Sequence, residues 1–133
     1  MVTILEHGAF ILNVKTKEGG IEPVKGRFDM QAIEAFCNTK EIPGVVILGK
    51  MFQTGMMPSH YAEFILSAVH RIIPKENCEY KVDDVNEWII QMGGFAGNEF
   101  MKLMAHGMRL FVRLKDESYE ALELTDEEKK ILN

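Results

Sequence analysis

The pattern of apolar and polar residues divides the chain into an extended N-terminal part and a longer helical part. Residues 10–14 are largely apolar and predict a strand, the Gly-Gly pair at 19–20 predicts a turn, and residues 21–24 are able to pair back. Pro23 restricts the second strand to the edge of a sheet, because proline has no N–H to donate. We therefore expect an N-terminal β-hairpin, with Ile4-Leu5 as a candidate third strand.

Beyond the hairpin, apolar residues recur at helical spacing. Asp29 is placed to cap a first helix, which ends near Lys40 because Pro43 disfavours helical geometry at the residue before it. The helical pattern is clearest at residues 59–73, where Ser59 is the expected cap. The apolar stripe of this helix consists of Tyr61, Phe64, Ile65, Ala68, Val69 and Ile72.

Two more helices are expected in the second half of the chain. The first ends at Gly93-Gly94; Asp84 with Glu87 makes a capping-box-like pair at its start, and Asp83 is the competing cap. The second begins near Asn98. Their apolar positions are Val82, Val85, Trp88, Ile89 and Met92 in the first, and Phe100, Leu103, Met104, Gly107, Leu110 and Phe111 in the second.

Two shorter segments complete the pattern. Residues 45–48 form an apolar run that suits a strand and a buried helical turn equally well. Residues 125–128, Thr-Asp-Glu-Glu, form a capping box that predicts a short, polar C-terminal helix.

These elements predict a mainly α fold of the α+β class. A β-hairpin at residues 1–27 and a compact bundle of about four to five helices at 28–114 are expected to form a single domain, residues 1–114. Residues 115–133 follow as an acidic C-terminal segment with a short helix. Seven acidic side chains against three lysines give this segment a net charge of −4, out of −5 for the whole chain.

Composition and charge narrow the classes of function. The chain is 47% hydrophobic and 26% charged, which is ordinary for a globular protein. No apolar run reaches the ~18 residues of a membrane-spanning helix, and no basic region precedes the first apolar residues, so we expect a cytoplasmic protein without a membrane partner. No basic stripe is present, so nucleic acid is not an expected partner.

No set of residues has the pattern of an active site. None of the four histidines stands at zinc-ligand spacing from another ligand type, and Cys37 and Cys78 form no CxxC motif. Ser59 and His60 are adjacent, so on a helix they point about 100° apart and do not face each other. Asp83-Asp84 lacks the further oxygen ligands and the glycine of a calcium loop. We expect no catalytic residue, no cofactor and no metal.

The methionines are the most distinctive apolar residues. The chain has nine, of which three lie at residues 51–57 and three at 101–108, and not all of them can face one small core. Flexible thioether side chains suit adaptable binding surfaces, although a methionine-rich core is the alternative. The candidate partner-binding residues are Met51, Phe52, Met56, Met57, Met101 and Met108. An exposed patch of this kind also predicts a homo-oligomer.

The order and sequence of these parts resemble the small tail assembly chaperones encoded by phages and prophages. The resemblance covers residues 10–112. It is carried by Arg-Phe-Asp-Met-Gln-Ala-Ile-Glu-Ala-Phe-Cys at 27–37, Tyr-Ala-Glu-Phe-Ile-Leu-Ser-Ala-Val at 61–69, and Tyr-Lys-Val-Asp-Asp-Val-Asn-Glu-Trp-Ile at 80–89. These are hydrophobic and capping patterns without a chemical signature.

The resemblance implies a non-enzymatic, self-associating protein in the cytoplasm of the infected host cell. Such a protein would bind the long, apolar, helical tape measure protein until tail-tube protein subunits polymerise around it. Two alternatives remain open. One is a structural tail completion or connector component of a phage or prophage. The other is a small enzyme or regulatory subunit that uses His60, His70 or the pair Asp83-Asp84.

Overall fold

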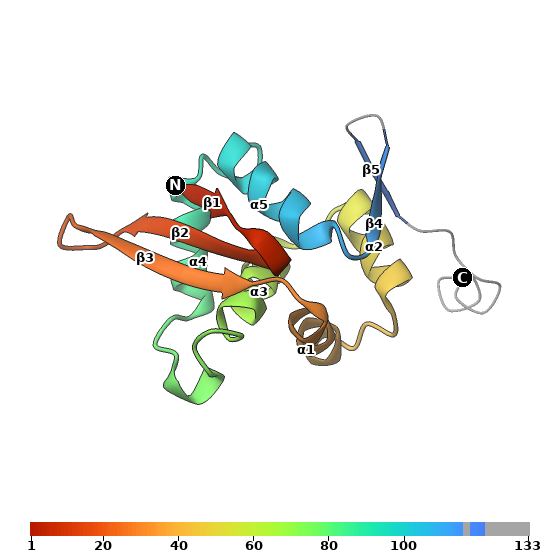
Figure 1. The fold of residues 1–133 in the computed structure, drawn as a ribbon, viewed down its shortest axis with the longest axis horizontal. Coiled ribbons are helices and arrows are strands. Elements are labelled where there is room, and N and C mark those ends of the chain that lie inside the picture. The colour runs from red at the N-terminus through yellow and green to blue at the C-terminus, as the bar shows by residue number, and fades with distance from the viewer. Residues whose placement is uncertain (116–117, 122–133) are drawn as a thin grey trace.

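The N-terminal part of the chain forms a three-stranded antiparallel sheet (Figure 1). The computed structural model describes residues 1–115 and 118–121. The strands lie in the order β1 (Val2–Ile4), β2 (Ala9–Lys15) and β3 (Ile21–Arg27). The expected hairpin is therefore confirmed. The third strand is also present, beginning two residues earlier than the sequence pattern indicated.

Side chains of the sheet alternate between the core and the solvent. Phe10, Leu12 and Val24 are on the buried face, where the Phe10 ring covers Gly26, its partner across the two strands. A β-carbon on Gly26 would lie 2.3 Å from that ring. The absence of a side chain at this position allows Phe10 to reach Phe28, with the ring centroids 5.0 Å apart. This aromatic contact joins the sheet to the helical part of the protein.

The helices follow the sheet in the chain and pack around one central helix (Figure 1). The described residues contain α1 (Met30–Lys40), α2 (Val45–Thr54), α3 (Pro58–Val69), α4 (Val82–Gln91) and α5 (Asn98–Met108), with the single-turn 3-10 helices η1 (Glu6–Gly8) and η2 (Lys75–Asn77). Helix α3 packs against α1, α4 and β3, while α5 lies beside β1 and α4 beside β2. None of these helices is both long and apolar enough to cross a membrane.

The centre of the core is a cluster of phenylalanine rings. Phe64 on α3 has its ring centroid 4.9 Å from that of Phe28, 5.3 Å from Phe36 and 4.9 Å from Phe52. All four side chains are buried. On α5, a β-carbon at Gly107 would lie 2.8 Å from the Phe64 ring, so glycine lets α5 approach the cluster closely.

Side chains of α5 cover the free edge of strand β1. The Glu99 carboxylate accepts a hydrogen bond from the Val2 N–H at 2.8 Å, and the Lys102 ammonium donates one to the Val2 carbonyl at 3.0 Å. The hydrogen bond from Val2 holds the pKa of the Glu99 carboxyl below its ordinary value, so this carboxylate stays charged. Both backbone polar groups of Val2 on this edge are therefore satisfied by helix side chains.

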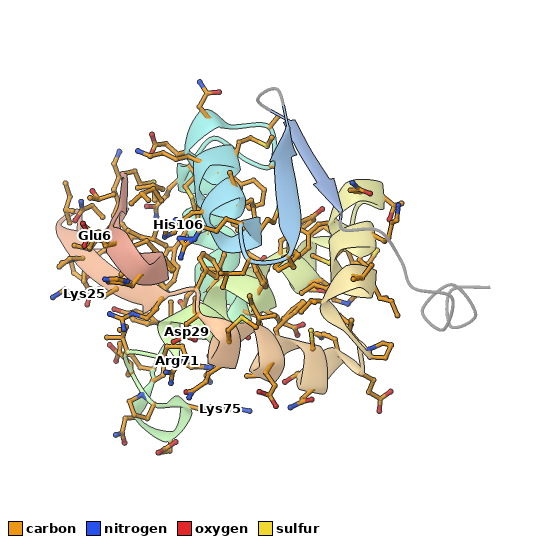
Figure 2. The ribbon with its side chains drawn as sticks, turned by 45° about the vertical axis from the view of Figure 1, so that its right-hand side comes forward. Glu6, Lys25, Asp29, Arg71, Lys75 and His106 are labelled. Carbon is orange, nitrogen blue, oxygen red and sulfur yellow. The ribbon has the colours of Figure 1, made fainter. Side chains whose placement is uncertain are left out.

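Two of the expected helix boundaries are confirmed. Asp29 caps α1, because its Oδ1 accepts a hydrogen bond from the Ala32 N–H at 2.9 Å. The Arg71 guanidinium also binds this carboxylate at 2.9 Å, and Figure 2 shows the two side chains next to each other. Gly93 and Gly94 both have positive φ and follow the end of α4, as the sequence pattern predicted.

Three expected caps are wrong. Helix α3 begins at Pro58, so Ser59 lies inside the helix instead of capping it. Helix α4 begins after Lys81, whose backbone N–H donates to Asp84 Oδ2 at 2.8 Å. Asp84 therefore accepts this hydrogen bond from the third helical position and is not itself the cap. Neither the expected Asp83 cap nor the expected pair of Asp84 with Glu87 is formed.

The ambiguous run at residues 45–48 is helical. It forms the first turn of α2, where Val46, Ile47 and Leu48 are all buried. A helix covered on several sides has no polar face over such a stretch, so its sequence loses the helical periodicity that would identify it. Phe52, on the same helix, is also buried and contacts Phe64 in the aromatic core.

The C-terminal part differs from the expectation. Helix α5 ends at Met108, which leaves Leu110 exposed although Phe111 is buried. Ile72 is likewise exposed, because α3 ends before it.

Two further strands follow α5. Strands β4 (Val112–Lys115) and β5 (Ser118–Ala121) form an antiparallel hairpin beside α2, so the expected domain boundary at 114 falls inside a strand. The short helix expected at residues 125–128 lies outside the described residues.

His106 is a buried polar side chain that ties α5 to the sheet. Its Nε2 lies 3.0 Å from the Ala9 carbonyl oxygen, and Arg109 Nη1 lies 3.2 Å from its Nδ1. Both contacts fit a neutral imidazole that donates to Ala9 and accepts from Arg109. Burial lowers the pKa of His106, and the Arg109 charge lowers it further. Figure 2 shows this histidine between α5 and the sheet.

We predict that Trp88→Ala strongly destabilises the protein. Trp88 is buried and its ring meets Tyr80 edge-on at 5.0 Å. Removing a buried aromatic ring typically costs about 3–5 kcal/mol of unfolding free energy. Urea denaturation followed by circular dichroism measures the effect. Ile90→Ala on the same helix is the control, because Ile90 is 66% exposed and its loss is expected to change stability by less than about 0.5 kcal/mol. Equal stability of both variants contradicts the core assignment.

We predict that acid weakens the fold partly through His106. A folded-state pKa below the unfolded value of about 6.5 means that the unfolded chain binds the proton more readily. The contribution to stability is then complete above about pH 6.5 and is lost as the pH falls through and below that value. Urea midpoints measured between about pH 7.5 and about pH 5 report this loss.

His106→Gln is the informative variant, because its side-chain amide keeps a donor near Ala9 and does not titrate. It should show a smaller drop in stability over the same pH range than the unmodified protein. His70→Gln is the control for the second histidine whose pKa is lowered by burial and by Lys75. An unchanged pH dependence in His106→Gln argues against the assigned role.

Candidate functional site

An apolar groove opens beside α5, with a volume of about 710 Å³. It is lined by Phe52, Gln53, Tyr61, Phe95, Asn98, Phe100, Met101, Lys102, Met104, Ala105 and Met108. These residues come from α2, α3, α5 and the turn before α5. Four aromatic and three methionine side chains therefore line one surface depression.

The aromatic residues of the groove contact one another. The Tyr61 ring centroid is 5.7 Å from Phe52, 5.5 Å from Phe95 and 5.8 Å from Phe100. The Tyr61 hydroxyl also accepts a hydrogen bond from the Met56 N–H at 3.2 Å, which ties it to the connection between α2 and α3. Mutually packed rings make a pre-formed surface that loses little conformational freedom when a ligand binds.

The accessible part of the groove is made by a methionine and a phenylalanine. Met101 is 57% exposed and Phe95 is also exposed, whereas Met104 and Phe100 are buried beneath them. Exposed large apolar side chains that gather at a depression mark interaction sites more often than chance exposure does. Lys102, Asn98 and Gln53 supply the polar groups of the lining.

The structure separates the six predicted partner-binding residues into two groups. Phe52, Met101 and Met108 line the groove, although Phe52 is itself buried and serves as part of its floor. Met51, Met56 and Met57 do not line it. Met51 and Met56 are partly buried against the core, and Met57 is exposed at the start of α3.

Sequence reasoning missed three aromatic residues of the groove. The sequence pattern places Tyr61 and Phe100 in the apolar stripes of their helices, and it gives no role to Phe95, which lies between Gly94 and Gly97. The signal that points to Phe95 is the presence of a large aromatic residue between glycines, in a turn too short to bury it. Tyr61 and Phe100 give no separate signal, because they belong to the same apolar stripes as true core residues.

A second groove, polar and of about 700 Å³, lies between the β2–β3 hairpin and α4. Its lining includes the acidic residues Glu18, Glu22, Asp83, Asp84 and Glu87, with Lys15 and Lys17. The Gln91 amide holds the hairpin to α4 by accepting from the Lys15 N–H at 2.8 Å and donating to the Lys15 carbonyl at 3.2 Å. The carboxylate of Asp84 is occupied at the helix start.

Burial raises the pKa of two titratable side chains among the described residues. Burial raises the pKa of Tyr80 in the polar groove to about 12, and its hydrogen bond with Glu22 acts in the same direction, so the phenol stays protonated. Burial also raises the pKa of the Cys37 thiol, which disfavours the reactive thiolate. His60 and His70 line neither groove. Among residues 1–115 and 118–121, no three His, Cys, Asp or Glu side chains are grouped to hold a metal ion.

Comparison with protein-family models, curated proteins and solved structures gives no significant match to this chain. The groove beside α5 is the best candidate site, because it combines a pre-formed aromatic floor with exposed apolar side chains at its opening. The chemistry of this lining suits contact with apolar side chains.

Proposed function

We propose that this protein is a non-enzymatic chaperone that binds an apolar helical segment of another protein in the groove beside α5. The observation that carries the proposal is the exposure of Met101 and Phe95 over a floor of packed aromatic rings. Helix-in-groove recognition uses a surface of this kind, in which an amphipathic helix lays its apolar side chains into a hydrophobic depression.

The methionines suit a partner whose apolar side chains vary along its length. Met101, Met104 and Met108 lie at i, i+3 and i+7 of α5, so they share one face of the helix towards the groove. Thioether side chains adjust their rotamers to different neighbours at low cost. Such a surface is able to bind successive segments of a long helical protein without requiring one particular sequence.

The resemblance to phage tail assembly chaperones identifies the partner that we propose. The tape measure protein is long, apolar and helical, and its exposed stripes require cover until tail-tube protein subunits assemble around it. A chaperone that binds the unassembled form keeps it soluble by mass action. We accordingly place the action of this protein in the cytoplasm of the infected host cell, with no nucleotide or cofactor involved.

We predict that co-expression with the tape measure protein of the same phage or prophage raises the soluble yield of that partner. Met101→Asp should abolish the rise, because a carboxylate buried at an apolar contact has no partner for its charge. The matched control is Ile90→Asp on α4, where an equally exposed apolar residue lies outside the groove. Circular dichroism should show that both variants are folded.

Three outcomes contradict the proposal. The partner is equally soluble without this protein, the two aspartate variants behave alike, or the protein is recovered as a constituent of mature particles. The third outcome favours the structural tail component instead.

A further inference from the structure

The outward face of the sheet carries three positive charges. Side chains at odd-numbered positions of β2 and β3 point away from the core. Lys15, Lys25 and Arg27 are exposed at such positions. Figure 2 shows Lys25 on the side of the sheet that is turned away from the helices. We call the outward residues Ile11, Lys15, Ile21, Lys25 and Arg27 the basic face.

The outward positions of these strands carry no carboxylate, although Lys15 also lines the polar groove with its acidic residues. Glu22 is at an even-numbered position and points to the other side of the sheet, where it meets Tyr80 in the polar groove. Glu6 is the first residue of η1, before β2, and Glu18 is in the turn between β2 and β3. Within the described strands, the outward positions therefore carry a charge of +3 although the whole chain carries −5.

The basic face also contains apolar side chains in register with its charges. Ile11 is opposite Lys25 across the strands, and Ile21 is opposite Lys15. Ile21 is 70% exposed, so its side chain is accessible beside Lys15. A ligand that alternates apolar and acidic side chains would satisfy both kinds of residue.

The chemistry of the face favours a peptide over nucleic acid. Proteins that bind single-stranded nucleic acid stack the bases on exposed aromatic side chains. The outward positions of the three strands, from Thr3 to Arg27, hold no aromatic residue. Three cations are also few for a phosphate-binding surface on an acidic protein.

The chain itself contains a segment with the matching pattern. Residues 122–128 read Leu-Glu-Leu-Thr-Asp-Glu-Glu, which gives four carboxylates, two leucines and no basic residue. They follow β5, which lies beside α2. Figure 1 shows β5 on the opposite side of the protein from the β2–β3 turn. The turn end of the basic face, with Lys15 and Ile21, is therefore remote from the end of β5, whereas the face of a neighbouring molecule is open to contact.

We propose that the basic face binds the acidic segment 122–128 of a second copy of this chain. The contact is head-to-tail, because each copy offers its face to one neighbour and its segment to another. Contacts of this type produce closed rings or open chains according to the rotation between successive copies. Opposite charges at the surface also make the association weaken as salt screens them. This assembly does not involve the groove beside α5.

The test is a charge exchange in the full-length protein, measured by sedimentation velocity over a range of concentrations. One variant carries Lys25→Glu and Arg27→Glu, a second carries Asp126→Lys, Glu127→Lys and Glu128→Lys, and a third carries all five changes. The unmodified protein should associate at about 0.05 M salt and dissociate at about 0.5 M. Each of the first two variants should associate at least about tenfold more weakly, because two attractive contacts or more become repulsive. The third should regain association, since the charges are complementary again.

Ile90→Asp, an exposed position outside both the groove and the basic face, is the matched control and should associate like the unmodified protein. The proposal is overturned if the unmodified protein is monomeric at low salt, or if the variant with all five substitutions stays dissociated. It is also overturned if neither added salt nor the variant with Lys25→Glu and Arg27→Glu (the face variant) weakens the association. Binding of a short single-stranded DNA that is lost in the face variant, while the segment variant associates normally, would assign the face to nucleic acid instead.

Discussion

Phe64 occupies the point at which the separate parts of this protein converge. Its ring on α3 stacks on Phe28, which follows the sheet, and meets the edges of Phe36 on α1 and Phe52 on α2. Each of these rings reaches a different element, so the sheet and the helices share one apolar centre. The close approach of α5 at Gly107 depends on the same ring. A cluster of this kind is sensitive to volume, because a gap at its centre cannot be filled by one neighbour alone.

The candidate groove is an outward continuation of that cluster. Phe52 contacts both Phe64 in the core and Tyr61 in the groove, and Tyr61 contacts Phe95 at the opening. The floor of the groove is therefore packed directly against the core behind it. Met101 stands free at the rim, which places adaptable side chains on a fixed base. That combination permits varied apolar ligands without a loosened fold.

Sequence reasoning succeeded where a local pattern had one physical meaning. The Gly-Gly turn fixed the hairpin, and Asp29 fixed the start of α1, because both features act through neighbouring backbone atoms. It failed where the deciding contact is distant. Residues 45–48 gave no helical period because α2 is covered on several sides. The cap of α4 escaped because Asp84 accepts from the Lys81 backbone, an interaction that leaves the cap residue itself without any signature.

The candidate site was predicted only in part, for a related reason. Methionine enrichment drew attention to α5, where Met101 and Met108 line the candidate groove. The same enrichment also pointed to the connection between α2 and α3, which does not contribute to it. Composition indicates how much apolar surface a chain carries, but the crossing of α2, α3 and α5 decides where that surface is concave.

The two edge strands of the three-stranded sheet, β1 and β3, are protected in different ways from pairing with a further strand. The backbone groups of Val2 on β1 are bonded to Glu99 and Lys102 of α5, and β3 carries Pro23, which offers no N–H to an incoming strand. If the protein acts as the chaperone that we propose, it meets extended chains, and an open strand edge would recruit them into fibrils. At Val2 and Pro23 such chains find no backbone N–H with which to begin strand addition, which would leave side-chain surfaces as the place of contact.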